Sequence, residues 1–184
     1  MNEFVAWPQC PAFPAEGEPV LVRVAGRELR GALGEILEKW GGASSWRETS
    51  RGPVCDWVDI SLSYAGDAGW IGLLRGGWIG IDAVQLEAFA EMDAVARLYL
   101  APAAVKEARN PNAFALAWTE MEARLKCMKR GLAEWSPDRD AGAQSCVTRS
   151  FVTADAVAVT VACKFAETKL EPGRGRSRER IARV

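Results

Sequence analysis

The segment 69–84, GWIGLLRGGWIGIDAV, constrains the fold more than any other part of the chain. It consists of two apolar runs separated by Arg75-Gly76-Gly77, a composition typical of a tight turn. Short apolar runs bounded by turn residues predict two strands. Because this segment lies near the middle of the 184-residue chain, it also predicts a division into two halves, with the centre near residues 78–82.

The N-terminal half has the pattern of a helix between two strands. Residues 18–24 (EPVLVRV) alternate as a strand does, and residues 57–66 (WVDISLSYAG) predict a strand that ends in small hydroxylated residues. Between them, apolar residues recur at helical spacing in 26–42, a segment that closes with two glycines. Residues 43–56 are polar and are predicted to form a loop.

The C-terminal half repeats this order of elements. We expect a mostly helical stretch over 86–109, a break at Asn110-Pro111, a helix over 112–130 that Gly131 stops, and two strands over 145–152 and 156–165. A helix laid on a few antiparallel strands in each half predicts an α+β fold of two similar lobes.

The expected domain boundaries follow from this organisation. The N-terminal lobe is predicted to span 1–78, including a Pro-rich lead over 1–19, and the C-terminal lobe to span 79–168. Residues 169–184 contain five arginines and are expected to form a disordered basic tail, with a contact to a phosphate-rich or acidic partner as the alternative. The net charge of -1 and the non-basic body do not predict a nucleic-acid partner.

Composition restricts the chemistry and the compartment. The chain has no histidine, which excludes Ser-His-Asp and Cys-His catalytic units and most zinc sites. Five cysteines without a Cys-x-x-Cys pair predict neither a disulfide framework nor a zinc ribbon, so a reducing cytoplasm is the expected location. We see no signal peptide and no apolar run long enough for a membrane span.

The segment 118–132, WTEMEARLKCMKRGL, places Trp118, Glu122 and Lys126 on one face of a helix, because they are four residues apart. A glutamate four residues before a lysine is also a common ion pair of solvated helix surfaces, so this spacing alone does not identify a site. Asp82 ends the second apolar strand, where it either caps the next element or needs a partner for a buried carboxylate.

Together these residues resemble the 4′-phosphopantetheinyl transferases, especially the two-lobed surfactin type. The family pattern is Gly-Ile-Asp at a strand end, here residues 80–82, and then W-x-x-x-E-A-x-x-K-x-x-x-x-G-L on a helix, here residues 118–132. Residues 60–66 (ISLSYAG) resemble the family's N-x-S-H-S-G segment, and residues 51–53 (RGP) resemble its G-K-P loop. The resemblance covers roughly residues 20–166 and includes the closing pair of strands.

The resemblance implies a Mg²⁺-dependent transferase that moves the 4′-phosphopantetheine arm of coenzyme A to a serine of an apo acyl or peptidyl carrier protein. It implies that Asp82 and Glu122 bind the metal, that Glu122 or a metal-bound water takes the serine proton, and that Lys126 binds phosphate. Two carboxylates suit Mg²⁺ and leave Mn²⁺ open. Trp118 is expected to pack the helix against the sheet. Since both lobes lie in one chain, we expect a monomer.

The nucleotide end of coenzyme A requires cationic residues, because arginine binds its 3′-phosphate well. Arg27, Arg30 and Arg51 are the candidates, with Ser63 as a donor from the strand end and Tyr64 in place of a family histidine. For Arg27 and Arg30, a solvated helix face is the alternative.

The chain departs from the surfactin-type pattern at three places. Val84 stands where that type has a third acid, Tyr64 replaces its histidine, and Gly52 replaces its loop lysine. The smaller acyl-carrier synthase branch also has an apolar residue at the position of Val84. These departures leave a second hypothesis open: a catalytically impaired homologue that binds a carrier domain or another protein.

Overall fold

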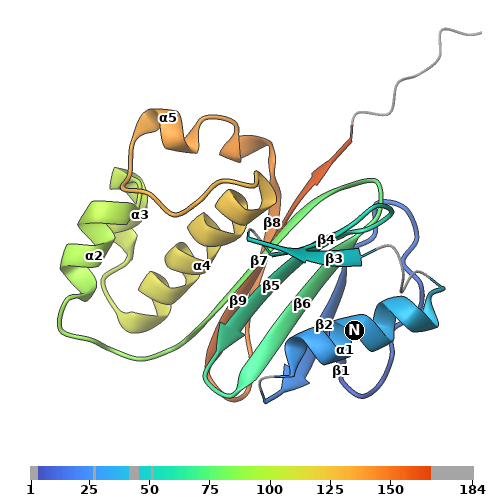
Figure 1. The fold of residues 1–184 in the computed structure, drawn as a ribbon. Helices are drawn as coiled ribbons and strands as arrows, with labels where there is room; N and C mark the ends of the chain where they lie inside the picture. The colour runs from blue at the N-terminus through green and yellow to red at the C-terminus, as the bar shows by residue number, and fades with distance from the viewer. Residues whose placement is uncertain (1–3, 27, 42–45, 51, 167–184) are drawn as a thin grey trace, which may run out of the picture.

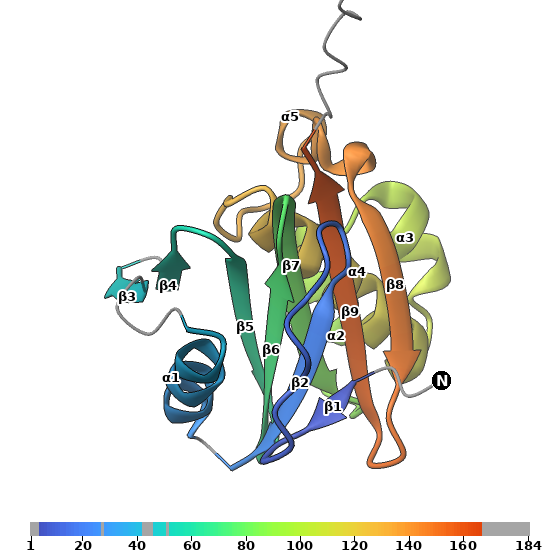
Figure 2. The same cartoon turned by 90° about the vertical axis from the view of Figure 1, so that its right-hand side faces the viewer.

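The computed structural model describes residues 4–26, 28–41, 46–50 and 52–166, which form a mixed α+β fold (Figure 1). Two sheets face each other, and helices cover the outer face of each (Figures 1 and 2). The layers are therefore helix, sheet, sheet, helix. The predicted α+β class is confirmed.

The first sheet comes from the N-terminal half, and a single helix covers it. In spatial order its strands are β1 (Val5–Ala6), β2 (Val20–Ala25), β6 (Ala68–Leu74) and β5 (Asp59–Ala65). All neighbours are antiparallel except β1 and β2. Helix α1 (Leu29–Lys39) packs on the outer face because its apolar residues recur at helical spacing and are buried: Leu29, Leu33, Ile36 and Leu37.

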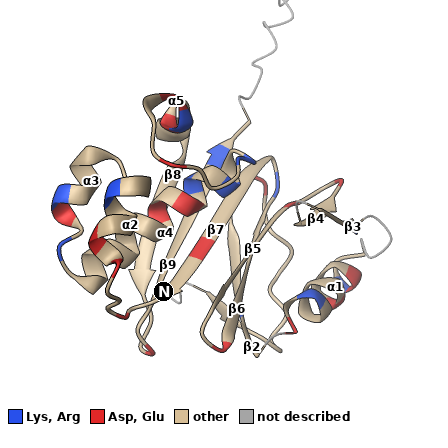
Figure 3. Ribbon diagram, turned by 60° about the vertical axis from the view of Figure 1, so that its left-hand side comes forward, with Lys and Arg blue, Asp and Glu red and all other residues tan. Residues whose placement is uncertain are grey.

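The second sheet comes from the C-terminal half and is fully antiparallel. Its strands, in spatial order, are β7 (Gly77–Gln85), β9 (Val157–Phe165) and β8 (Val147–Val152). The helices of this half are α2 (Met92–Tyr99), α3 (Pro102–Glu107), α4 (Pro111–Cys127) and the short α5 (Pro137–Asp140). Helix α4 lies across β7 and β9, and the acidic segment of β7 lies beside charged turns of α4 (Figure 3).

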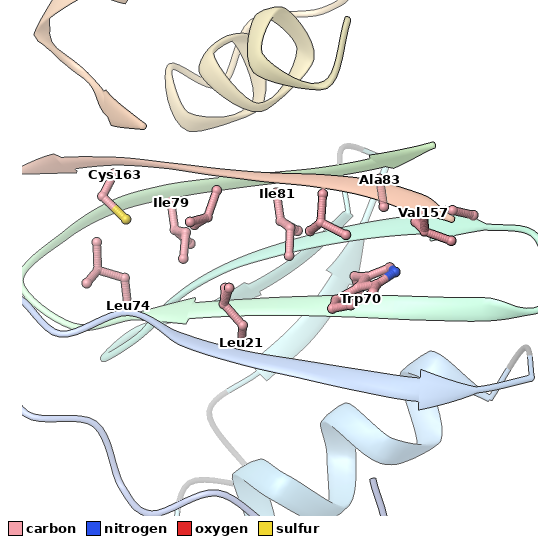
Figure 4. Close-up of a cluster of buried hydrophobic side chains, with 11 residues drawn as sticks. Leu21, Trp70, Leu74, Ile79, Ile81, Ala83, Val157 and Cys163 are labelled. Atoms are coloured by element: carbon pink, nitrogen blue, oxygen red, sulfur yellow. The ribbon is translucent and has the colours of Figure 1, made fainter. Parts of the chain in front are cut away.

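An apolar core fills the space between the two sheets (Figure 4). Strands β2 and β6 contribute Leu21, Trp70 and Leu74, and β7 contributes Ile79 and Ile81. Gly72 leaves room for this packing, since a Cβ there would come within 3.1 Å of the Ile79 side chain. The core explains why both runs of the segment 69–84 are apolar: each contributes side chains to the layer between the sheets.

Side chains of β5 satisfy the backbone of β7 where the two sheets meet. The amides of Ile79, Ile81 and Ala83 donate hydrogen bonds to Asp59 Oδ2 at 2.7 Å, Ser61 Oγ at 2.9 Å and Ser63 Oγ at 3.1 Å, respectively. The acceptors alternate along β5 because every second side chain of a strand points to the same face. We call these three pairs the β5–β7 seam.

The two strands predicted in 69–84 are confirmed as β6 and β7, and they belong to different sheets. One other prediction for the N-terminal half is wrong. In the segment predicted as a loop, the described residues form an antiparallel pair, β3 (Trp46–Thr49) with β4 (Gly52–Cys55). The polar sequence of this pair lacks the apolar alternation by which a strand is recognised.

The helices of the C-terminal half also end differently from the prediction. The predicted helix over 112–130 ends at Cys127, before Gly131, and Lys129, with φ of 57°, takes the left-handed conformation just after its end. The prediction that Gly131 stops the helix is therefore wrong.

The predicted helical stretch over 86–109 is interrupted between α2 and α3. Pro102 disfavours helical geometry at the residue before it.

Among the described residues, no helix is both long enough and apolar enough to cross a membrane.

Candidate functional site

Gly80 determines how closely α4 approaches β7. A Cβ added to Gly80 would overlap the carbonyl oxygen of Ala123 and the amide nitrogen of Cys127, both in α4. Ala123 is fully buried at this contact. Because the helix backbone touches the strand here, the neighbouring side chain of Lys126 reaches the strand as well.

Asp82 is buried on β7 and bonded by two other elements. It is 5% exposed, and its Oδ1 accepts hydrogen bonds from Lys126 Nζ at 2.6 Å and from Ser63 Oγ at 2.9 Å. Lys126 Nζ also lies 3.1 Å from the carbonyl oxygen of Ile81 and 3.4 Å from Ser63 Oγ. Strands β5 and β7 and helix α4 thus meet at one compact polar cluster, which compensates the burial of the Asp82 charge.

Glu122 borders this cluster one helical turn before Lys126. Its Oε2 lies 4.0 Å from Lys126 Nζ. Burial raises the pKa of Glu122 above its ordinary value, the charge of Asp82 raises it further, and Lys126 opposes both effects. The ammonium group of Lys126 therefore lies within 4.0 Å of both carboxylates, those of Asp82 and Glu122. The structure brings together four predicted site residues: Ser63, Asp82, Glu122 and Lys126.

The donor set of the cluster fits a hard divalent cation. Asp82 and Glu122 offer carboxylate oxygens, which are the ligands that Mg²⁺ and Mn²⁺ prefer. Within the described ranges, no group of three or more His, Cys, Asp or Glu residues is placed to hold a metal ion. Val84, two residues after Asp82, offers no oxygen from its side chain. A cation bound here would take two protein carboxylates and would compete with Lys126 for Asp82.

Arg30 and Tyr64 lie on the other face of β5. Arg30 donates hydrogen bonds to Glu48 at 2.9 and 3.2 Å and to the Tyr64 hydroxyl at 3.2 Å. The hydrogen bond to Glu48 raises the pKa of Arg30. Tyr64 is 46% exposed and follows Ser63, so alternation along the strand directs it away from Asp82. The structure does not join this exposed pair to the Asp82 cluster. Arg27 and Arg51 lie outside the described residues.

Trp118 packs against helices, so the prediction that it packs α4 against the sheet is wrong. Its ring stacks on Phe114 with centroids 5.8 Å apart and meets Tyr99 edge-on at 5.7 Å. Trp118 and Phe114 belong to the cluster between α2, α3 and α4. Ala123 is the residue of α4 that faces β7, and Trp118, five residues earlier, lies on a different side of the helix. Its spacing of four residues from Glu122 therefore does not bring Trp118 to the sheet.

Sequence reasoning missed a second ion pair beside the cluster. Lys129 Nζ lies 2.6 Å from Asp59 Oδ2, the atom that also accepts the amide of Ile79. The left-handed conformation of Lys129 turns the chain out of α4 at this point. One signal was available: Asp59, Ser61 and Ser63 alternate along one predicted strand, and such a row of acceptors indicates a face that meets donors.

The comparisons with known proteins add no relative to this description. No protein-family model matches the chain, and no curated protein matches it significantly.

Proposed function

We propose that this protein is a 4′-phosphopantetheinyl transferase of the two-lobed kind. It would transfer the 4′-phosphopantetheine arm of coenzyme A to a serine hydroxyl of an apo acyl or peptidyl carrier protein, with Mg²⁺ as cofactor. The observation that carries the proposal is that Asp82 of β7 lies at one cluster with Glu122 and Lys126, which lie on adjacent turns of α4 and are distant from Asp82 in the sequence. The facing sheets, each covered by a helix, agree with two similar lobes.

The reaction forms one bond and breaks one. The serine oxygen attacks the β-phosphorus of coenzyme A, the bond from this phosphorus to the oxygen of the departing 3′,5′-adenosine bisphosphate breaks, and the serine proton must be removed. Phosphoryl transfer depends mainly on positioning and on neutralising charge. The proposal therefore requires a base and positive charge, rather than a covalent intermediate on the protein.

The residues of the cluster have matching roles in this proposal. Asp82 and Glu122 would hold Mg²⁺, which supplies positive charge against the pyrophosphate when bound. Glu122 would accept the serine proton, since burial raises the pKa of its carboxyl above the ordinary value and makes the carboxylate a better base. Lys126 contributes its ammonium charge to the phosphate oxygens. Ser63 orients Asp82 through the 2.9 Å hydrogen bond.

Arg30, Tyr64, Arg27 and Arg51 stay candidates for the nucleotide end of coenzyme A. Since Arg30 is half exposed and already bonded to Glu48, phosphate would have to compete with that carboxylate. The five cysteines within the described residues are all free thiols, which supports a reducing location such as the cytoplasm.

One observation favours a second candidate function, a carrier-binding relative without transferase activity. The three nearest acceptors of Lys126 Nζ are Asp82 Oδ1, the carbonyl of Ile81 and Ser63 Oγ, all within the protein. An ammonium group has three donors, so this lysine is satisfied without substrate. In this reading the cluster only joins α4 to β7.

The deciding experiment mixes the purified protein with coenzyme A, Mg²⁺ and a panel of apo carrier proteins, and follows each carrier by intact mass. We expect a mass increase of one phosphopantetheine group, its loss on removal of Mg²⁺ by a chelator, and its loss in Glu122→Gln. Glu120→Gln, on the other flank of the same helix, is the matched control and should retain activity. No transfer to any carrier would contradict the proposal, and carrier binding without transfer would establish the second candidate.

A further inference from the structure

A large cavity lies on the flank of α4 opposite the Asp82 cluster. It has a volume of about 630 Å³ and lies between α3, α4, α5 and the edge strand β8. The division of α4 is clear from its contacts: Glu120 reaches Thr148 on β8, whereas Lys126 reaches Ser63 on β5. Cavities of a few hundred cubic ångströms are typical of small-molecule sites. The described residues that line this one include none of the proposed transferase residues.

The walls of the cavity are mainly apolar. Side chains from two helices and the segment between α2 and α3 supply them: Leu100, Ala104, Leu116, Ala117 and Met121. Leu100 is buried, whereas the other four side chains are partly exposed. The wall therefore retains apolar surface, and an aliphatic chain that covers it removes this surface from water.

The charged groups deep in the wall are already paired with each other. Arg124 Nη2 donates to Glu120 Oε1 at 2.6 Å. Arg139 Nε donates to Asp140 Oδ1 at 2.7 Å. The remaining charged residue of the lining is Glu107, an exposed residue of α3. A cationic ligand would find both paired carboxylates occupied, and an anionic ligand would meet two neutralised arginines and an excess of negative charge. The electrostatics therefore favour a ligand without charge.

Each of the two arginines nevertheless keeps one buried N–H group without an acceptor. Within the described part of the chain, Arg124 Nε and Arg139 Nη2 form no hydrogen bond, although Arg139 Nη2 lies 2.7 Å from Asp140 Oδ1. Among the described residues, only one other buried polar side-chain atom has no partner, Trp70 Nε1. Burying a donor without an acceptor is costly. This cavity therefore has donors in excess of acceptors.

We propose that the cavity binds a small neutral molecule, an aliphatic chain that ends in a carbonyl group. The apolar walls hold the chain, and the carbonyl oxygen accepts the unused N–H of Arg124, a lining residue whose side chain is 26% exposed. A carbonyl group supplies the missing acceptor without adding charge, so both ion pairs of the wall stay intact. The proposal does not depend on the transferase function, because it uses the other flank of α4.

The experiment compares three eight-carbon probes, 2-octanone, octanoate and octylamine, by isothermal titration of the full chain. We expect 2-octanone to bind about tenfold or more tightly than either charged probe. Arg124→Lys keeps a positive charge beside Glu120 and removes the Nε–H group, so it should weaken binding of 2-octanone about tenfold. Arg97→Lys, at an exposed residue of α2 outside the lining, is the matched control and should leave the affinity unchanged.

A second pair of variants tests whether the ligand lies in the cavity. Ala117→Leu should weaken binding of 2-octanone about tenfold or more, because the larger side chain fills part of the space that the ligand needs. Ala94→Leu makes the same change at an exposed residue of α2 that does not line the cavity, and it should have no effect.

The proposal is overturned if 2-octanone does not bind, or if either charged probe binds equally or more tightly. Unchanged affinity in Arg124→Lys would also overturn it, since water would then satisfy the donor. Circular dichroism checks the fold of each variant. If Arg124→Lys is unfolded, the probe comparison and Ala117→Leu decide, and unchanged affinity in Ala117→Leu would place the ligand outside the cavity.

Discussion

Lys126 and Asp82 connect α4 to β7 through an ion pair of 2.6 Å. The Asp82 side chain is 8% exposed and that of Lys126 30%, so the pair lies largely away from water. A buried carboxylate that loses its partner is costly, because its desolvation is no longer compensated. The pair therefore has a structural consequence whatever the protein binds.

Lys126→Met should lower the free energy of unfolding by about 3 kcal/mol, because it leaves Asp82 buried without its cation. Chemical denaturation measures this change. Lys106→Met, at an exposed residue of α3, is the control and should change stability by less than about 0.5 kcal/mol. The double variant Asp82→Asn/Lys126→Met should recover part of the loss, and strict additivity of the two single changes would refute the coupling.

Gly80→Ala should separate α4 from β7 and lower the free energy of unfolding by about 1–3 kcal/mol or more, because the new methyl group overlaps the backbone of Ala123 and Cys127. Gly31→Ala is the matched control in α1, where a Cβ meets no atom within 4 Å. This control should stabilise the protein by about 0.5–1 kcal/mol, since alanine favours a helix interior. Equal effects of the two variants would show that α4 does not pack as described.

Glu122→Gln should stabilise the protein at neutral pH in metal-free buffer. Burial and Asp82 raise the pKa of Glu122 above its ordinary value of 4.5, so the folded state holds this proton more tightly than the unfolded state. Stability contributed by the protonated carboxyl is therefore lost as the pH rises from the ordinary pKa through the raised one. The advantage of the variant over the wild type should shrink below pH 4.5, as measured by thermal unfolding across pH. An advantage independent of pH would contradict this.

Ser61→Ala should lower the free energy of unfolding by about 1–3 kcal/mol, because the buried amide of Ile81 loses its acceptor in the β5–β7 seam. Ser145→Ala removes an exposed hydroxyl that donates to the carbonyl oxygen of Gly142 and should cost less than about 0.5 kcal/mol. Urea unfolding of both variants tests the seam, and a loss no larger than that of the control would show that water replaces the hydroxyl.

Local patterns predicted most of the elements of the fold. Helix α1 follows from apolar residues at helical spacing, because it is buried on one face. Strand β9 follows from a short apolar run, because residues on both of its faces are buried. Pairing was less predictable: Arg75-Gly76-Gly77 indicates a reversal of the chain but does not say whether the two strands share a sheet. The β3–β4 pair and the end of α4 at Cys127 were missed, because tertiary contacts override weak local preferences there.

The candidate site was predicted in part. Helical spacing placed Glu122 and Lys126 together, and the expense of burying Asp82 indicated a partner. The sequence did not reveal that Lys126 itself would be this partner, because that contact depends on the close approach of α4 at Gly80. We predicted Arg30 as a candidate phosphate ligand, and in the structure it is paired with Glu48. The sequence alone contains no pattern that predicts this pair.

The β5–β7 seam also limits how this protein can associate with itself. A strand edge with unpaired amides is a template for a strand of another molecule and promotes edge-to-edge aggregation. On β7 this hazard is removed by Asp59, Ser61 and Ser63, whose side chains occupy the amides that a foreign strand would need. Loss of these side-chain acceptors would therefore leave the amides of β7 free to pair with a strand of another molecule.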